Sequence, residues 1–387
     1  MRALSLSISI LVAILSIIVF REQVTEFATT SFNSVLANFN KFYNGDSSTV
    51  TTTTAAKPES ESPFYNPKEK LVANDMSVPR AIRKVFLAAE QAEGAGARVR
   101  RSIGTPQLRN FSPFLMLDHF SIKPGAGFPD HPHRGQETIT YLLGHCITLI
   151  CSPGCAVDHE DFAGNAGTIE SGGLQFMTAG RGIMHAEMPR QNADGSANVG
   201  LQLWVDLPTH LKACEPRYRD LKAKEIPAVD LDDGKVHIKV ISGQAGGVDS
   251  VQDLAYTPVW LLDVEIQPGG KLVQPLPKDF NAFAYTLKGT AVFGTGASKQ
   301  AVAQYHNCVF EPEGDVVIVE VPENATESAQ FVLVAGQILN QKVVQYGPFV
   351  LSTPEEVRQA LMDYQFHMNG FERAKDWQSE IGKSMVG

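Results

Sequence analysis

The chain has 387 residues, of which 43% are apolar and 19% charged, a composition typical of globular proteins and a length suited to two domains. The net charge of −9 argues against a large basic surface for phosphate backbones, so we expect no direct nucleic-acid binding. The five cysteines do not have the spacing of a zinc finger or a secreted disulfide scaffold.

The first 22 residues are dominated by an apolar stretch. Residues 3–20 read ALSLSISILVAILSIIVF, which is 18 residues without a charge. That length is at the lower limit for a membrane-spanning helix and long for a signal-peptide core, and no clear cleavage site precedes Arg21. We interpret residues 1–22 as a hydrophobic helix that serves as a signal or membrane anchor, which indicates a membrane-anchored or secretory location. The alternative is a buried helix of a globular domain.

The next segment, residues 23–77, is predicted to be a disordered linker. Its run GDSSTVTTTTAAKPESESPFYN is rich in Ser, Thr, Pro and Glu and has little apolar surface to bury. We expect ordered structure to begin near Val78.

Short alternating or apolar runs, separated by Gly, Pro, Asn and Asp, fill the chain from there to about residue 348. Examples are ETITYLL, GLQLWVDL, VWLLDVEI and AQFVLVAG. This pattern predicts an all-β sandwich or barrel. The runs fall into two sets, so we expect two β-domains, at residues 78–210 and 211–387.

The end of the second domain is predicted to be helical. PEEVRQALMDYQF and ERAKDWQSEIGK both read as helices. The first has Thr353 as N-cap, Pro354 at the first helical position and Glu356 in position for a capping box.

The stretch FPDHPHRGQETITYLLG, residues 128–144, contains the strongest chemical signal. His131 and His133 are two residues apart and share one face of a strand, and Glu137 has the same parity. Downstream, TAGRGIMHAEMP places His185 and Glu187 two residues apart. The two pairs can converge inside a barrel and form a metal site, for which Glu137 and Glu187 both remain candidate carboxylate ligands.

Imidazole and carboxylate without thiolate suit Fe(II), and also Mn, Ni, Cu or Zn. Four ligands on an octahedral metal leave two positions open for a substrate and O2.

These motifs, with DHEDFAGNAG, EPRYRDL, ISGQAGG, GPFVLST and NGFERAKDWQSEIG, resemble the pirin family from about Pro79 to the C-terminus. The resemblance implies two tandem cupin (jelly-roll) barrels with a C-terminal helical tail. It also implies one iron in the first barrel, a metal-binding cupin at 78–210. We expect no metal in the second cupin at 211–387, because His237 and His306 are isolated in the sequence and His367 lies in the tail. The implied iron ligands are His131, His133, His185 and Glu187. Glu137 then becomes a carboxylate that either supports the metal site, for example by fixing Arg134 or an imidazole N–H, or has a structural role.

Some pirin-like proteins resemble flavonol dioxygenases of the quercetinase type, which implies O2 and a flavonol as substrates. Glu187 is then the candidate base for the substrate hydroxyl, with Gln175, Met177 and Gln202 as residues that line the pocket. The alternative is an iron- or redox-responsive transcriptional co-regulator without significant enzymatic activity, which binds a transcription factor and resides in the nucleus or cytoplasm.

The chain departs from the family pattern after Gly144. Residues 145–155 form an apolar insert that contains Cys146, Cys151 and Cys155. One interpretation is a loop with a redox or metal role. We favour a retained-intron artefact, because an exposed ITLIC run promotes aggregation.

Overall fold

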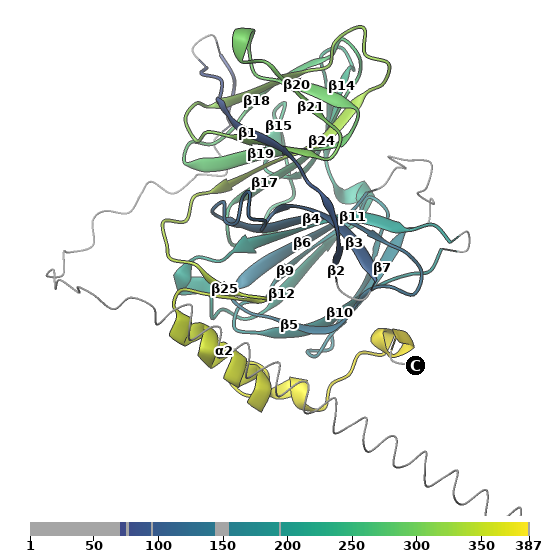
Figure 1. Cartoon of the computed structure of the whole chain (residues 1–387), viewed down its shortest axis with the longest axis vertical. Helices are drawn as coiled ribbons and strands as arrows, with labels where there is room; N and C mark the ends of the chain where they lie inside the picture. The colour runs from purple at the N-terminus through teal and green to yellow at the C-terminus, as the bar shows by residue number, and fades with distance from the viewer. Residues whose placement is uncertain (1–69, 75–76, 94–95, 144–154, 193–194, 386–387) are drawn as a thin grey trace, which may run out of the picture. The chain divides into compact units, whose positions relative to one another are not determined.

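Strands dominate the computed structural model, which describes residues 70–74, 77–93, 96–143, 155–192 and 195–385. They form two double-sheet barrels, followed by a C-terminal tail with one α-helix among the described residues (Figure 1). The expected fold class, all-β with two cupin barrels, is therefore confirmed.

The first barrel consists of a seven-stranded sheet in the order β12-β9-β6-β11-β4-β3-β2 and a four-stranded sheet in the order β5-β10-β7-β8. Its strands are β2 (Glu90–Glu93), β3 (Ala97–Ile103), β4 (Phe114–Ile122), β5 (Phe128–His133), β6 (Gln136–Leu142), β7 (Ala156–Asp161), β8 (Ala166–Glu170), β9 (Leu174–Thr178), β10 (Ile183–Pro189), β11 (Asn198–Asp206) and β12 (Arg217–Leu221).

The second barrel repeats this plan with the sheets β1-β22-β19-β24-β17-β14-β13 and β18-β23-β20-β21. Its strands are β1 (Ile82–Leu87), β13 (Ala228–Leu231), β14 (Val236–Ser242), β17 (Val259–Ile266), β18 (Lys271–Pro275), β19 (Phe280–Lys288), β20 (Thr290–Phe293), β21 (Gln300–Ala303), β22 (His306–Phe310), β23 (Val316–Glu320) and β24 (Ala329–Gln337). Two short ribbons complete the strands: β15 (Gln244–Ala245) with β16 (Val248–Asp249), and β25 (Val344–Tyr346) with β26 (Phe349–Leu351).

The seven-stranded sheets share one apolar core. Phe176 and Leu203 of the first barrel lie in the same buried cluster as Phe283 and Val334 of the second. Because successive side chains of a strand point to opposite faces, the intervening residues face the barrel interiors. A large apolar cluster that includes Phe293 fills the second interior, whereas the first interior contains many polar side chains.

Each barrel includes a strand from the other half of the chain, so a division between residues 210 and 211 does not coincide with the boundary between the barrels. β1 pairs with β22 of the second barrel, although it precedes every strand of the first. β12 follows residue 210 and yet pairs with β9 of the first barrel. Order also begins before residue 78, because the backbone N–H of Leu71 donates to Gln244 Oε1 at 2.8 Å.

The tail begins with the predicted helix, α2 (Pro354–Phe366). Its capping box is present: the Glu356 N–H donates to Thr353 Oγ1 and the Thr353 N–H donates to Glu356 Oε2. The second predicted helix is wrong, because that segment forms only two short 3₁₀ turns, Glu372–Lys375 and Ile381–Met385. Tertiary contacts replace the helical ladder there, since the N–H of Ile381 donates to Glu160.

Several predictions concern residues outside the described ranges, namely the hydrophobic segment 1–22, most of the linker, and Cys146 and Cys151 of the insert. Cys155 is described, and its buried thiol donates to the Ala197 carbonyl at 3.7 Å. Among the described residues, no helix has the length and apolar character needed to cross a bilayer.

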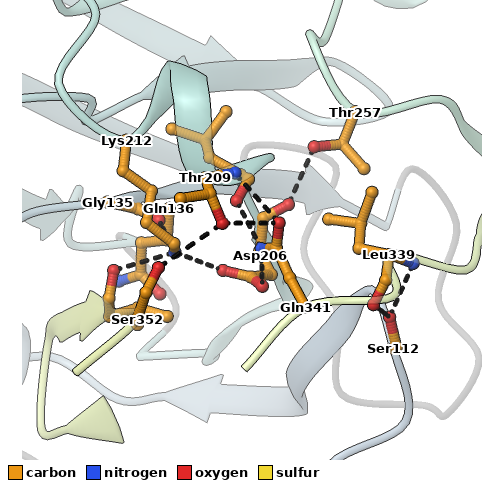
Figure 2. A network of polar contacts seen from close by, with 12 residues as sticks. Ser112, Gly135, Gln136, Asp206, Thr209, Lys212, Thr257, Leu339, Gln341 and Ser352 are labelled. Atoms are coloured by element: carbon orange, nitrogen blue, oxygen red, sulfur yellow. Dashed lines mark hydrogen bonds and ion pairs between the residues drawn. The ribbon is translucent and has the colours of Figure 1, made fainter. Parts of the chain in front are cut away.

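A buried ion pair connects the first barrel to the segment that leads into α2. Lys212 Nζ lies 2.6 Å from Asp206 Oδ1 and donates to the carbonyls of Gly135 and Val350, each at 3.0 Å (Figure 2). Gln341 Nε2 donates to the other Asp206 oxygen at 2.6 Å. The ammonium therefore joins three distant parts of the chain.

We expect Lys212→Met to lower the free energy of unfolding by about 3–5 kcal/mol, because it leaves the Asp206 carboxylate buried without its counter-charge. Denaturant unfolding of the full chain measures this loss. The matched control is Lys299→Met, which removes an exposed ion pair with Glu320 and should cost about 0–1 kcal/mol. Equal losses for the two variants would contradict the role of Lys212.

His119 of β4 occupies the interface between the barrels. Its Nδ1 is 3.1 Å from the Tyr285 hydroxyl, and its ring also packs against Tyr305. Desolvation, together with the charge of Arg100, lowers the pKa of His119 to about 4. Burial of this imidazole thus favours its neutral form.

The lowered pKa of His119 predicts a loss of stability in acid. Between its ordinary value of 6.5 and about 4 the unfolded chain binds a proton that the folded chain does not, so stability falls as the pH drops through this range. The His119 contribution to the loss between pH 7.5 and 5 is about 2 kcal/mol. Unfolding at both pH values should show a smaller loss, by about this amount, for His119→Gln than for the wild type. Identical losses would refute the assignment.

Candidate metal centre

Three histidines converge inside the first barrel. His131 and His133 come from β5, and His185 comes from β10, which pairs antiparallel with β5 so that His131 and His185 lie opposite each other. Ligand atoms of the three imidazoles all lie within 4.8 Å of one another. The predicted convergence of the two His-containing strands is therefore present in the structure.

Local backbone features aim these side chains. A register shift interrupts the β5–β10 ladder between His185 and Glu187. After β5 the chain turns at Gly135, which has a φ of +78° and donates its N–H to the Gly180 carbonyl at 2.8 Å. A Cβ at Gly135 would lie 2.0 Å from the Val350 carbonyl oxygen, so the turn requires glycine.

The ring nitrogens of the three histidines have different partners. His131 Nδ1 lies 2.8 Å from the Pro129 carbonyl oxygen, and His133 Nδ1 lies 2.7 Å from the side-chain nitrogen Nε2 of Gln136. Both ring nitrogens of His185 are buried and have no hydrogen-bond partner among the residues that the structure describes. Because an unpaired buried polar group is costly, these nitrogens fit a site that is completed by a cation.

Burial also sets the charge of the cluster. Desolvation, followed by the charge of His131, lowers the pKa of His133 well below its usual value. The pKa of His185 is lowered in the same way, with further contributions from neighbouring histidines. Both rings are therefore neutral at pH 7, which is the form that binds metals.

Glu187 of β10 is buried in the same interior but is not a member of the three-histidine group. Thr140 Oγ1 donates to its Oε1 at 3.1 Å, and Gln202 Nε2 donates to its Oε2 at 2.9 Å. Trp204 Nε1 in turn donates to Gln202 Oε1 at 3.1 Å, and its indole lies edge-on to the His133 ring. The carboxylate is thus oriented by two donors, and its role as a fourth ligand remains a prediction.

Glu137 does not lie at the histidines, although its position in the sequence has the same parity. The turn at Gly135 separates β5 from β6, so alternation starts again at Gln136 and Glu137 faces the second barrel. Its Oε1 accepts from the Tyr256 N–H at 2.9 Å, and its Oε2 from the Thr257 N–H at 3.0 Å. Glu137 is a structural carboxylate between the barrels.

Arg134 pairs with neither Glu137 nor an imidazole, contrary to expectation. Its guanidinium lies 2.6 Å from Asp363 of α2 and donates to the carbonyls of Arg181 and Asn369. It also stacks on the Phe371 ring. Arg134 therefore attaches the tail to the barrel.

The other predicted pocket residues occupy different places. Gln202 contacts Glu187, as described above, and Met177 packs in a small apolar cluster with Ile183. Gln175 Nε2 lies 2.9 Å from His159 Nε2 and donates to Asp220 Oδ1 at 3.1 Å.

Sequence reasoning missed several residues of this interior, and only strand pairing reveals them. His159 lies opposite Glu187 in the β7–β10 ladder. Thr140, Trp204 and Gln136 lie on strands of the opposite sheet, so no spacing within one strand points to them. Alternation along ETITYLL divides its residues between the two faces of a strand. It does not show which of the two faces is directed toward the histidines.

Comparisons with known proteins agree with this architecture. The Pirin family model matches residues 96–205, and the model of the Pirin C-terminal cupin domain matches residues 261–370. Human pirin is 46% identical over 307 residues, which cover 79% of this chain and 100% of that protein. A pirin-like protein of Solanum lycopersicum is 45% identical over 304 residues, or 79% of this chain and 98% of that protein. A crystal structure of quercetin 2,3-dioxygenase from Acinetobacter baumannii is 27% identical, with a TM-score of 0.64, and the match covers 75% of this chain and 98% of that one. This chain therefore belongs to the pirin family of two-barrel cupins.

Proposed function

We propose that this protein is a metal-dependent dioxygenase that cleaves a flavonol with O2 in the first barrel. The observation that carries the proposal is the buried cluster of His131, His133 and His185, in which neither ring nitrogen of His185 has a hydrogen-bond partner within the described part of the chain. The likeness to a quercetin 2,3-dioxygenase at 27% identity supports the same substrate class.

The proposed metal ligands are the three histidines and Glu187. The donor set of imidazoles and a carboxylate suits Fe(II), and it also accepts Mn, Ni, Cu or Zn. Held by these residues, Fe(II) would supply the redox chemistry that the reaction of a flavonol with O2 needs.

Glu187 is the candidate base for the flavonol hydroxyl. Its carboxylate accepts hydrogen bonds from Thr140 and Gln202, which hold its orientation. A proton from the substrate hydroxyl would move to a Glu187 oxygen, in the role of a general base within hydrogen-bond reach.

A second candidate function, a redox-responsive co-regulator that binds a transcription factor, has one observation in its favour. Arg134 directly follows His133 in the chain, and its guanidinium holds Asp363 of α2 at 2.6 Å. A change of charge at the histidines could therefore alter how the tail is held. This function requires the same metal but no turnover.

An oxygenase assay separates these functions. The full chain is loaded with Fe(II) without air and then given quercetin and O2. We expect it to consume the quercetin, seen as a loss of flavonol absorbance, and to release carbon monoxide. We expect His133→Ala to reduce the rate at least 100-fold, because one ligand position is lost, with lower iron content on analysis. The control His237→Ala removes an exposed imidazole paired with Asp230 in the second barrel and should leave the rate unchanged. Iron-loaded wild-type protein without turnover would refute the oxygenase and leave the co-regulator.

Two carboxamide variants test the ligand assignment. Glu187→Gln should weaken metal binding about 10–100-fold or more, because it removes the proposed anionic ligand. Glu137→Gln should leave metal affinity near that of the wild type and lower stability by about 1–3 kcal/mol, because it perturbs the buried contacts to Tyr256 and Thr257. Chelator competition and denaturant unfolding measure the two effects. The reverse ranking of metal affinities would overturn the assignment.

A further inference from the structure

Gln136, the first residue of β6, is a fully buried glutamine at the edge of the histidine cluster. Its amide nitrogen lies 2.7 Å from His133 Nδ1 and 3.4 Å from the Pro348 carbonyl oxygen. Its side-chain amide oxygen is buried and, in the described ranges, has no hydrogen-bond partner. Figure 2 shows Gln136 beside Gly135, close to the Lys212 ion pair.

The partner of Nδ1 decides which nitrogen of His133 can bind a metal. A neutral imidazole carries one proton, and only the unprotonated nitrogen is a ligand. When the Gln136 NH2 group donates to Nδ1, the proton resides on Nε2, which then cannot bind. When the Gln136 oxygen accepts from Nδ1–H, Nε2 is free.

His131 offers a contrast on the same strand. Its Nδ1 lies 2.8 Å from the Pro129 carbonyl oxygen, which can accept a hydrogen bond but cannot donate one. His131 is thus held in the form that leaves Nε2 free, whereas the form of His133 depends on a side-chain amide that can present either face.

We infer that Gln136 is a positioning residue that controls metal affinity. It does so by presenting either its NH2 group or its oxygen to His133 Nδ1, which decides which nitrogen of that ring carries the proton. A half-turn about the Cγ–Cδ bond places Oε1 on Nδ1–H, which provides the donor that this oxygen lacks. The inference rests on the proposed metal centre and is independent of the oxygenase reaction.

The turn exchanges partners around the side-chain amide. It gives the oxygen the Nδ1–H donor and moves the NH2 group away from both His133 Nδ1 and the Pro348 carbonyl, which still accepts from the Arg134 N–H at 3.2 Å. The neighbouring segment stays fixed, because the Val350 N–H donates to the Arg134 carbonyl at 3.0 Å and Lys212 Nζ donates to the Val350 carbonyl. The Pro348 and Val350 carbonyls thus keep their other donors after the turn, whereas the NH2 group moves to the position at which the amide oxygen has no partner among the described residues.

The test compares Gln136→Leu with Gln136→Glu in the full chain, with Zn²⁺ as a redox-inert probe in chelator competition. Leucine gives Nδ1 no partner, and we expect affinity to fall about 10–100-fold. Glutamate can only accept from Nδ1–H, and we expect affinity equal to or tighter than that of the wild type. The matched control is Gln274→Leu, which alters a buried glutamine of the second barrel bonded to the carbonyls of Gln244 and Pro275. Unchanged affinity in both Gln136 variants would overturn the inference.

A second measurement needs no metal. The ¹⁵N shifts of the His133 ring in metal-free protein, assigned by their loss in His133→Ala, report which nitrogen carries the proton. We expect Nε2–H in the wild type and Nδ1–H in Gln136→Glu, and the same proton position in both would refute the inference even if Gln136→Leu fails to fold. Wild-type protein that binds no Zn²⁺ or Fe(II) would refute both the metal centre and the role of Gln136. Metal binding without flavonol turnover would refute only the proposed reaction.

Discussion

The two faces of β6 are the constraint on which the arrangement of this molecule depends. Because a strand alternates its side chains, Gln136 and Thr140 reach the histidines and Glu187, while Glu137 and Tyr141 reach the second barrel. Tyr141 donates its hydroxyl to Asp263 of β17 at 2.8 Å. A shift of β6 by one residue would exchange the two sets, so the pairing of the barrels and the geometry of the candidate site are fixed together.

This constraint explains why two barrels of the same plan differ inside. The second barrel is filled by apolar side chains, including Phe293 and Phe331, and this rigid core supports β17, whose Asp263 receives Tyr141. The interior of the first barrel contains buried histidine, glutamate and glutamine side chains, which are costly to bury unless each has a partner. The apolar core of the second barrel thus stabilises a first barrel whose interior is occupied largely by polar side chains.

Much of the fold could be predicted because its signals are local. Alternating runs marked the strands, and Thr353 with Pro354 marked the start of α2. The pairs His131/His133 and His185/Glu187 were visible because each lies on a single strand.

What could not be predicted depends on register and on backbone turns. Spacing does not reveal that β7 places His159 opposite Glu187. Glu137 does not share the face of His131 and His133, because Gly135, with its positive φ, interrupts the alternation between them. The prediction of a second helix in the tail was wrong because tertiary acceptors such as Glu160 bind N–H groups that would otherwise donate within a helix.

Each barrel depends on strands that come from the other half of the chain. β1 closes one edge of the second barrel, while β12 and the tail belong to the first, so no single cut in the chain separates two complete barrels. Each half would expose an unpaired strand edge, which is a template for aggregation. Neither half of the chain therefore carries all the strands of its own barrel, and each barrel is completed only when both halves are present.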